Sequence, residues 1–450
     1  MPSLDKCRVR AVWLRSGFAP FVLALVFAGL LHAQNDQSTL NGQIERLTRQ
    51  LNDDQANRRD DAEQALLKLA PVDNAEQCDA FLELLPQPLE GMPEEVRLRL
   101  TRLRREIETR QANQALSASR LSLSADGMDL AAVFEAIRAQ TANHLSDHRD
   151  QFGQNATPRP VTIEIDDEEF WPAVDKILDQ AQLSLYGFSG EKTLAVVDRE
   201  QGAAERSGQA SYAGPFRIEA TKVVAQRNLR TPAQQGVRVE LEIAWEPRLR
   251  PIALSQPIEA IEVTGDDGSA ILPASPRAVL DVEVQPGSHS TKLTIPLALP
   301  PRNVTALATF RGRMSALVPG RVVEFQFTDL AQAKGVRQQR GGVKVILDGT
   351  RKNQALWEVH MRVQVESEEA GLQSHRGWVF QNITYLLNRA GEVIDHAGFE
   401  TTRQSKREVS LAYFFDLPDD EIGAYTWVYR TPAAIVRVPI EYKLKDIPLP

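Results

Sequence analysis

The sequence predicts a multidomain chain in which N-terminal all-α hairpins and a small α+β module precede two tandem antiparallel β-sandwich domains. Three observations predict this fold class. Apolar residues recur at helical spacing over residues 36–116, and a strand-and-helix pattern occurs twice, 40 positions apart, within residues 119–200. Two regions of alternating residues, 215–330 and 343–450, end on similar lines, EFQFTDL and EYKLKDI. A chain of 450 residues is long enough for about three or more domains.

The segment 36–116 is predicted to form four short helices. Apolar stripes such as Leu40-Ile44-Leu47-Leu51 and Val96-Leu100-Leu103-Ile107 follow helical periodicity, and the pattern resembles HEAT-like α-hairpins. Arginines on the last helix alternate with glutamates, which favours an ion-paired face over an anion-binding patch. Cys78 shares a helical face with Phe81 and Leu85, so we expect a buried apolar thiol and not a nucleophile.

The α+β module shows its repeat when LSLSADGMDLAAVFEAIRAQ, from Leu121, is aligned with VTIEIDDEEFWPAVDKILDQ, from Val161. Alternating apolar residues predict a strand in each copy, Asp126 or Asp166 ends it, and a helix follows. The runs LSLYGF and TLAVVD, split by Ser-Gly-Glu-Lys, then predict a hairpin. The expected order is strand, helix, strand, helix, strand, strand.

With these residues the segment 119–200 resembles the short N-terminal (STN) domain of secretins and TonB-dependent receptors. In that family a strand, an Asp-containing turn and a helix are repeated before a final hairpin, and the module is a periplasmic interaction domain. The resemblance therefore implies a protein-binding role and brings no catalytic residues. No receptor-barrel or secretin-pore sequence follows residue 200, so it does not imply either role for the whole chain.

The β-rich half is predicted to contain two domains of similar plan. VRVELEIAW and WEVHMRVQV alternate in the same way, and a turn-bearing pair, 263–271 and 386–394, follows each. EFQFTDL and EYKLKDI are expected to be the last strand of each domain. Residues 201–214 and 331–342 are small and polar and indicate linkers. The spacing is typical of immunoglobulin or fibronectin-III sandwiches, although the cysteine pair of antibody domains is missing.

The N-terminus indicates export. Basic residues from Lys6 to Arg15 precede the apolar run 18–33, and Ala33 lies at a plausible cleavage site, so residues 1–33 are predicted to be a signal peptide. An uncleaved anchor is the alternative. We expect a periplasmic or secreted protein with no membrane span after signal removal, because no later apolar segment reaches the ~20 residues that a span needs.

Charge and cysteine content exclude some functions. The net charge of −8 becomes −11 without residues 1–34, which hold four basic groups and one acid, so nucleic acid is not an expected partner. Cys78 alone remains after signal removal, so no internal disulfide is expected, and the core must supply the stability.

The sequence assigns no catalytic, cofactor-binding or metal-binding residue. HExxH, CxxC, phosphate-loop, GxSxG and EF-hand patterns are all missing. His144 and His148 stand at i and i+4, the spacing of zinc ligands on a helix, but the surrounding NHLSDHRD favours a solvated loop. The remaining histidines considered, His289, His360, His375 and His396, show no partner in the pattern. The acids at 166–169 and 266–267 fit helix starts and turns.

Aromatic residues gather in the last domain, where Tyr425, Trp427 and Tyr429 alternate on one strand face. Rings that fill a sandwich core are the favoured interpretation, and an exposed platform for a glycan is the alternative. The leading hypothesis is a non-catalytic bacterial envelope scaffold with protein partners. The alternatives are a polysaccharide-binding or polysaccharide-acting hydrolase of the envelope, and a partner of a secretion or transport complex through the STN-like module.

Overall fold

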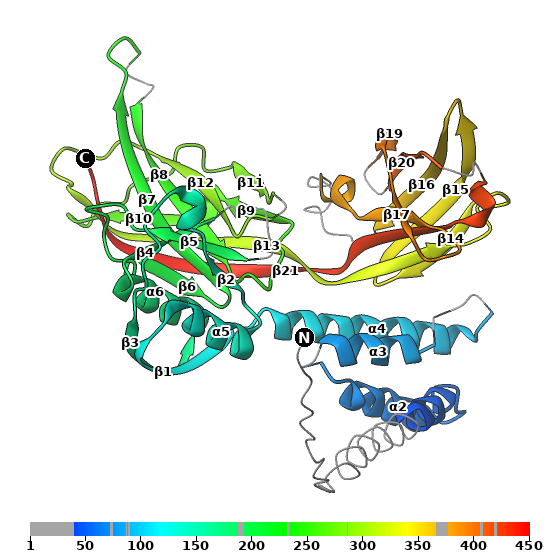
Figure 1. Cartoon of the computed structure of the whole chain (residues 1–450). Helices are drawn as coiled ribbons and strands as arrows, with labels where there is room; N and C mark the ends of the chain where they lie inside the picture. Colours follow the sequence, from blue (N-terminus) through cyan, green and yellow to red (C-terminus); the bar gives the residue numbers. More distant parts are fainter. Residues whose placement is uncertain are drawn as a thin grey trace, which may run out of the picture. The chain divides into compact units, whose positions relative to one another are not determined.

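The computed structural model describes residues 40–450 except 73–74, 87, 89–90, 188–192, 232–234, 286, 366–376, 406–407 and 418–420. The predicted signal peptide and His375 lie outside the described residues. The described chain consists mostly of β-sheets with a few helices (Figure 1), and it divides into two compact units that meet in sequence between Glu106 and Ile107. None of the helices in the described ranges is long and apolar enough to cross a membrane.

The first unit is helical, as predicted. Within the described residues four helices form: residues 40–50, α2 (Ala56–Leu69), α3 (Ala75–Leu84) and α4 (Glu94–Ala115), the last of which continues into the second unit. Their apolar stripes are buried, including Ile44, Leu51, Leu66, Phe81, Leu100 and Leu103. Cys78 is buried as well, as expected.

Two arginines of α4, Arg99 and Arg102, are held by carboxylates, whereas the buried Arg104 donates to the carbonyls of Leu82 and Leu85 at 2.8 and 2.9 Å. Arg99 lies 2.7 Å from Glu63, 2.7 Å from Glu95 and 2.8 Å from Asp60, and only 11% of its side chain is exposed. Arg102 lies 2.9 Å from Glu63. The ion-paired interpretation is therefore confirmed for Arg99 and Arg102, with the difference that Arg99 and Arg104 are largely buried.

The α+β module, residues 119–200, follows α4 and belongs to the second unit. A two-stranded antiparallel sheet joins β1 (Arg120–Met128) and β3 (Val161–Glu169), which lead into α5 (Leu130–Thr141) and α6 (Phe170–Gln180). A three-stranded sheet follows in the order β2–β5–β4, formed by β2 (Leu145–Asp147), β4 (Leu183–Tyr186) and β5 (Leu194–Asp198). Strand β2 was not predicted, and β1 and β3 continue past Asp126 and Asp166.

The 40-residue repeat is present in the hydrogen bonding as well as in the element order. The Gln140 side chain accepts from the Ser122 N–H at 3.0 Å and donates to the Ser122 carbonyl at 2.9 Å. Forty residues later, Gln180 makes the same two bonds to Thr162, at 3.0 and 2.6 Å. Each helix end is thus tied to the start of its own strand by the same amide.

The two copies also bond to each other reciprocally. The Thr162 hydroxyl accepts from the N–H of Gly127 at 2.9 Å, and the Ser122 hydroxyl accepts from the N–H of Asp167 at 3.0 Å. Gly127 and Asp167 are again 40 positions apart, and both have positive φ, +63° and +42°. The 40-residue sequence repeat therefore corresponds to two copies of one strand–helix unit, which are hydrogen-bonded to each other.

We expect Gln140→Ala and Gln180→Ala to weaken the module by similar amounts, about 1 kcal/mol each, because each removes the same pair of solvent-accessible hydrogen bonds. Hydrogen exchange should rise in β1 for the first variant and in β3 for the second. Gln151→Ala, at an exposed position in the 3₁₀ turn η1 (Asp150–Phe152), is the matched control and should change neither strand. A response to only one of the two glutamines would contradict their equivalence.

The remaining chain forms three sheets. The first has the order β12–β8–β7–β6 and contains β6 (Ala210–Ala213), β7 (Phe216–Arg227), β8 (Gln235–Trp245) and β12 (Ser290–Leu297). The second contains β9 (Ala253–Pro257), β10 (Ile261–Gly265), β11 (Val279–Glu283), β13 (Ala306–Phe327), β17 (Thr384–Leu387), β18 (Val393–Asp395) and β21 (Thr426–Pro448). The third has the order β14–β15–β16–β20–β19 and contains β14 (Val336–Arg340), β15 (Val343–Asn353), β16 (Leu356–Val365), β19 (Gly398–Gln404) and β20 (Glu408–Phe415).

Three further short 3₁₀ helices are described in this half: η2 (Ile258–Ala260), η3 (Gly377–Gln381) and η4 (Ile422–Ala424). The predicted turns are present: Gly268 donates to the Gly265 carbonyl after β10, and Gly391 donates to Asn388 between β17 and β18. The predicted linkers are more ordered than expected, since residues 201–214 include β6 and residues 331–342 include β14.

Strands β13 and β21 run antiparallel to each other from the Ala306–Pro448 pair to the Phe327–Trp427 pair (Figure 1). Their two halves serve different cores. Phe310 of β13 and Tyr442 of β21 are buried in one hydrophobic cluster, whereas Phe325 of β13 and Tyr429 of β21 are buried in another. The two strands therefore link two cores that are otherwise largely built from separate stretches of chain.

We call the two parts the first β module (residues 210–318 and 436–449) and the second β module (residues 319–435). The second module is thus inserted between β13 and the last half of β21. Three residues of the first module, Ile252, Ala253 and Leu317, also belong to the second core.

The prediction that EFQFTDL is the last strand of the first β domain and EYKLKDI the last strand of the second is therefore wrong. EFQFTDL contributes Phe325 and Phe327 to the second core, and EYKLKDI contributes Tyr442 and Leu444 to the first. Each segment thus packs in the core of the module that was expected to end with the other segment. The cores therefore do not follow the predicted boundaries 215–330 and 343–450. The physical reason is that alternation fixes which side chains point inward but does not specify the neighbouring strand.

Candidate binding groove

A hollow of about 620 Å³ lies in the α+β module between α5 and β2. This is within the range of about 300–1,000 Å³ that is typical of ligand sites. Helix α5 contributes Leu130, Ala131, Phe134, Glu135 and Arg138, and all three residues of β2 line the hollow together with Asp129, His144, Arg149, Ala156 and Pro158. We call it the α5–β2 groove.

Strand β2 has one free edge at this groove. Among the described strands it pairs only with β5, in parallel, through bonds such as His148 N–H to the Val196 carbonyl at 2.9 Å and Leu194 N–H to the His144 carbonyl at 2.8 Å. In a parallel ladder alternate residues turn their polar groups to the same neighbour, so those of Leu145 and Asp147 point away from β5. Across the ranges that the structure describes, these backbone groups make no hydrogen bond within the protein.

The groove is lined by charges of both signs. The Arg138 guanidinium is ion-paired with Glu135 on the exposed side of α5, and this hydrogen bond lowers the pKa of Glu135. Across the groove, Arg149 contacts both carboxylate oxygens of Asp147, with its Nη2 atom 2.6 Å from Oδ2. Burial raises the pKa of Asp147, but the hydrogen bonds from Arg149 outweigh it and leave the pKa below its usual value. Both carboxylates are therefore ionised at neutral pH.

Arg149 also fixes the loop that forms the far wall. Its Nη1 atom donates to the carbonyls of Asn155 and Thr157, at 3.2 and 3.1 Å. Only 2% of the Arg149 side chain is exposed. A buried guanidinium with all of these acceptors holds the loop from residue 149 to 158 against β2, so the groove is preformed.

The two histidines of the NHLSDHRD segment lie on either side of β2. Their segment is extended and not helical, so four residues of rise place them about 13 Å apart along the chain. His144 is exposed and lines the groove, whereas His148 is buried with its Nε2 atom 2.8 Å from the Ser146 hydroxyl. This geometry separates the pair that helical spacing would have brought together on one ion.

Other histidines have structural surroundings. His360 lies with its Nε2 atom 2.7 Å from Glu358, which also accepts from Arg351 at 2.6 Å and from Asn353 at 2.6 Å. Burial raises the pKa of Glu358, but these hydrogen bonds together leave it lowered. His289 is buried, and the ring of His396 packs at 5.2 Å against that of Tyr413. In the described ranges no group of three or more His, Cys, Asp or Glu side chains is placed to hold a metal ion.

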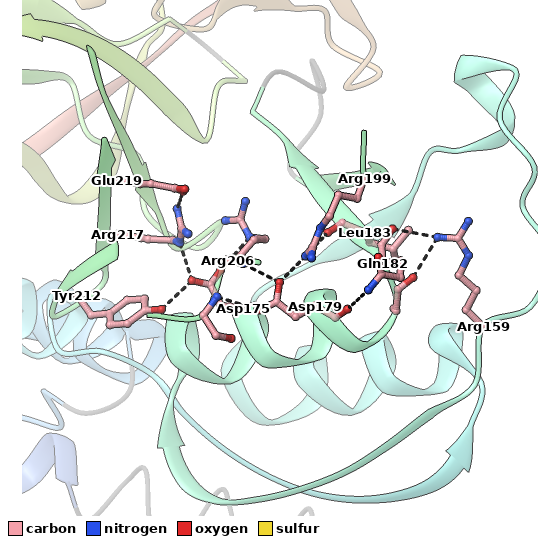
Figure 2. Close-up of polar contacts among 12 residues, drawn as sticks. Arg159, Asp175, Asp179, Gln182, Leu183, Arg199, Arg206, Tyr212, Arg217 and Glu219 are labelled. Atoms are coloured by element: carbon pink, nitrogen blue, oxygen red, sulfur yellow. Dashed lines mark hydrogen bonds and ion pairs between the residues drawn. The ribbon is translucent and has the colours of Figure 1, made fainter. Parts of the chain in front are cut away.

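Asp175 of α6 is fully buried at the junction between the α+β module and the first β module (Figure 2). It accepts from Arg217 at 2.8 Å, from Arg206 at 3.0 Å and from the Tyr212 hydroxyl at 2.7 Å. Burial and the nearby Asp175 charge raise the pKa of Tyr212, so the phenol stays protonated and donates. Burial, followed by repulsion from Arg217, lowers the pKa of Arg206.

One helical turn further on, Asp179 extends this contact. It accepts the backbone N–H groups of Arg206 and Ser207 at 2.7 and 2.8 Å, and it pairs with Arg199 (Figure 2). The segment from Arg206 to Tyr212 is therefore fastened to α6, although its composition had indicated a linker.

Glu246, at the end of β8, forms a second anchor and is also fully buried. It accepts from the Ser119 N–H at 2.9 Å, the Ser119 hydroxyl at 2.6 Å, Asn143 at 2.9 Å and Arg248 at 2.6 Å. Trp171 adds a bond from its indole N–H to the Pro215 carbonyl at 2.9 Å. These contacts leave Asp175 and Glu246 occupied by structural donors and fix the α5–β2 groove relative to the first β module.

The alternating aromatic residues around the start of β21 are part of a hydrophobic core. Tyr425, Trp427 and Tyr429 are at most 3% exposed and belong to the second hydrophobic cluster. The Trp427 indole donates to Thr384 at 2.7 Å, and Asn382 donates to the Tyr429 hydroxyl at 2.7 Å. The favoured interpretation is confirmed, and these three rings do not form an exposed platform for a glycan.

The acidic clusters also have local roles. Asp167 pairs with Arg120 at 2.7 Å and Glu168 with Lys176 at 2.6 Å at the end of β3. Asp267 accepts from the Ser269 N–H at 2.9 Å within the turn after β10. Turn formation accounts for the second cluster, as the sequence indicated. The first cluster lies within β3 and forms ion pairs, and no acidic side chain caps α6, so its expected role at a helix start is wrong.

No family model matches this chain, no curated protein is significantly similar to it, and no solved structure matches it significantly. The groove could not be predicted from the sequence, because β2 is three residues long and lies between polar residues. Periodicity does not reveal a strand of that length.

Proposed function

We propose that this chain is an exported bacterial envelope protein that acts as a non-catalytic interaction module. The basic and apolar N-terminal pattern supports export to the periplasm or beyond. The resemblance of residues 119–200 to the STN domain supports a binding role, and the order of two strand–helix units before the β4–β5 hairpin agrees with that resemblance. The HEAT-like and immunoglobulin-like assignments of the other modules are part of the same proposal.

The observation that carries the proposal is the free edge of β2 in a preformed groove. An edge strand with unpaired N–H and C=O groups is a template for another strand. Many peptide-binding domains use such an edge for affinity and the adjacent side chains for specificity. Here Leu145 and Asp147 offer the backbone groups, while Arg138 and His144 lie beside them to select the side chains. The partner we propose is an extended segment of another envelope protein.

The test is photocrosslinking in native cells from two alanines of the same helix. Ala131 and Ala139 are both exposed on α5, but only Ala131 lines the groove. A photoreactive amino acid at position 131 is expected to capture a protein partner, and the same residue at position 139 is not. Mass spectrometry of the adduct should identify an extended peptide within the partner.

Two outcomes would overturn the proposal. Equal capture from positions 131 and 139 would show that the groove is not the binding surface, and no capture above background from position 131 would show that no protein occupies it. Fractionation of the same cells tests export separately, because a protein that stays with cytoplasmic markers contradicts the signal-peptide assignment.

A further inference from the structure

The β7–β8 hairpin of the first β module projects beyond the strands beside it (Figure 1). Strand β6 pairs only with Phe216–Glu219 of β7, and β12 pairs with β8 only as far as Val237. Among the described residues, β7 past Glu219 has only β8 as a partner, whereas β8 stays paired with β12 back to Val237 and extends beyond it at Gln235 and Gly236. We call the described residues 220–231 and 235–239 the basic finger.

The basic finger carries positive charge in an acidic protein. The chain has a net charge of −8, yet residues 220–239 contain four basic residues and no acid. Within the part of the chain that the structure describes, Arg227, Arg230 and Arg238 have no carboxylate within ion-pair distance. Lys222 lies opposite Glu240 on β8, and that glutamate is already bonded to Lys292 at 2.8 Å. The positive field at the end of the finger is therefore not neutralised locally.

The same end of the hairpin exposes apolar side chains. Leu229 is 87% exposed in the turn, between Arg227 and Arg230, and Val224 is 40% exposed on β7. On the outer face of the finger, Val224 lies directly opposite Arg238 in the strand register. Apolar side chains at a tip flanked by arginines match the boundary between lipid headgroups and acyl chains, where guanidinium groups meet phosphates and a leucine leaves water.

We propose that the basic finger binds the surface of an anionic lipid bilayer, with Leu229 entering the acyl boundary and Arg227, Arg230 and Arg238 contacting lipid phosphates. Lipid is favoured over an acidic protein because the finger is narrow, and its largest exposed apolar side chain lies at its extremity. This surface belongs to the first β module and is independent of the α5–β2 groove. A chain bound in this way would hold its protein-binding groove near a membrane.

The first test measures co-sedimentation of residues 34–450 with vesicles of phosphatidylcholine alone or with phosphatidylglycerol added. This chain lacks the apolar run 18–33, which would itself bind lipid. Binding is expected only with phosphatidylglycerol, and it should weaken as salt is added. The double variant Arg227→Glu/Arg230→Glu should bind at least about tenfold more weakly, because each basic residue near an anionic surface adds to the attraction.

Arg337→Glu/Arg403→Glu is the matched control, since both arginines are exposed on strands of the second β module and form no ion pair with any residue that the structure describes. It should leave binding unchanged. Equal binding to both kinds of vesicle, or equal loss in both double variants, would overturn the proposal. Capture of an acidic protein through Arg227 and Arg230 without any binding to vesicles would overturn it as well and would assign the finger to a protein partner.

The second test follows the tip itself. Leu229→Cys and Leu272→Cys place a thiol at two exposed leucines, 87% and 69% accessible, while Cys78 is buried. A polarity-sensitive dye at position 229 should brighten with phosphatidylglycerol vesicles, and the same dye at position 272 should not. No change at position 229 would contradict the insertion of the tip.

Discussion

Replacement of Asp175 by alanine is expected to open the junction between the α+β module and the first β module. The carboxylate is fully buried and is shared by Arg206, Arg217 and Tyr212. Its removal leaves Arg217, with 2% of its side chain exposed, next to a second guanidinium that it repels. Breaking one side of a buried ion pair in this way typically costs about 3–5 kcal/mol.

Native-state hydrogen exchange measures this effect where it occurs. Protection should fall in α6 and β6 in the Asp175→Ala variant, while the second β module keeps its protection. Asp126→Ala is the matched control, because Asp126 is an exposed aspartate of β1, and its loss should change stability by less than about 0.5 kcal/mol. A variant at position 175 that loses no more protection than this control would show that the buried cluster does not hold the junction. Asp175→Asn keeps the shape of the side chain and should fall between the two.

Phe325→Ala is expected to destabilise the second β module, and Tyr442→Ala is expected to destabilise the first. This is the reverse of what their positions in the sequence suggest. Phe325 is fully buried in the core of the second β module, and Tyr442 is 3% exposed in the core of the first. The Tyr442 ring also packs closely over Gly312, its partner across the strands, and its hydroxyl donates to Gln256 at 2.9 Å. Truncation of a buried aromatic side chain to alanine typically costs about 3–5 kcal/mol.

Native-state hydrogen exchange of individual strands is again the measurement. Phe325→Ala should raise exchange in β15 and β16, and Tyr442→Ala should raise it in β8 and β12. The two variants serve as controls for each other, because each should spare the strands that the other affects. The opposite result, with Phe325→Ala opening β8 and Tyr442→Ala opening β16, would restore the tandem order of domains and would contradict the shared strands.

Features that depend on local periodicity could be predicted from the sequence. The four helices, the strand–helix repeat and the turns near Gly268 and Gly391 follow from spacing and turn chemistry, and each is present. The burial of Tyr425, Trp427 and Tyr429 followed from alternation on a strand. These features are set by residues that lie close together in the chain.

Features that depend on distant residues were missed. The segment from Arg206 to Tyr212 has the composition of a linker, but Asp175 and Asp179 of α6 hold it, a pairing that no local pattern encodes. The groove needs a three-residue strand whose partner among the described strands, β5, lies almost fifty residues later. The exchange of last strands was hidden because EFQFTDL and EYKLKDI have the same alternation, which makes either segment compatible with either core.

The pairing of β13 with β21 has a consequence for how the chain acquires its structure. A ribosome completes the first half of β13 before any residue of the second β module, and it completes the last half of β21 only after all of that module. Until then β13 is paired with β9 and β10 but lacks β21 on its other side. An uncovered strand edge of this kind attracts other chains. Chaperone demand should therefore persist through synthesis of the C-terminal half, even though most of the first β module has already been made.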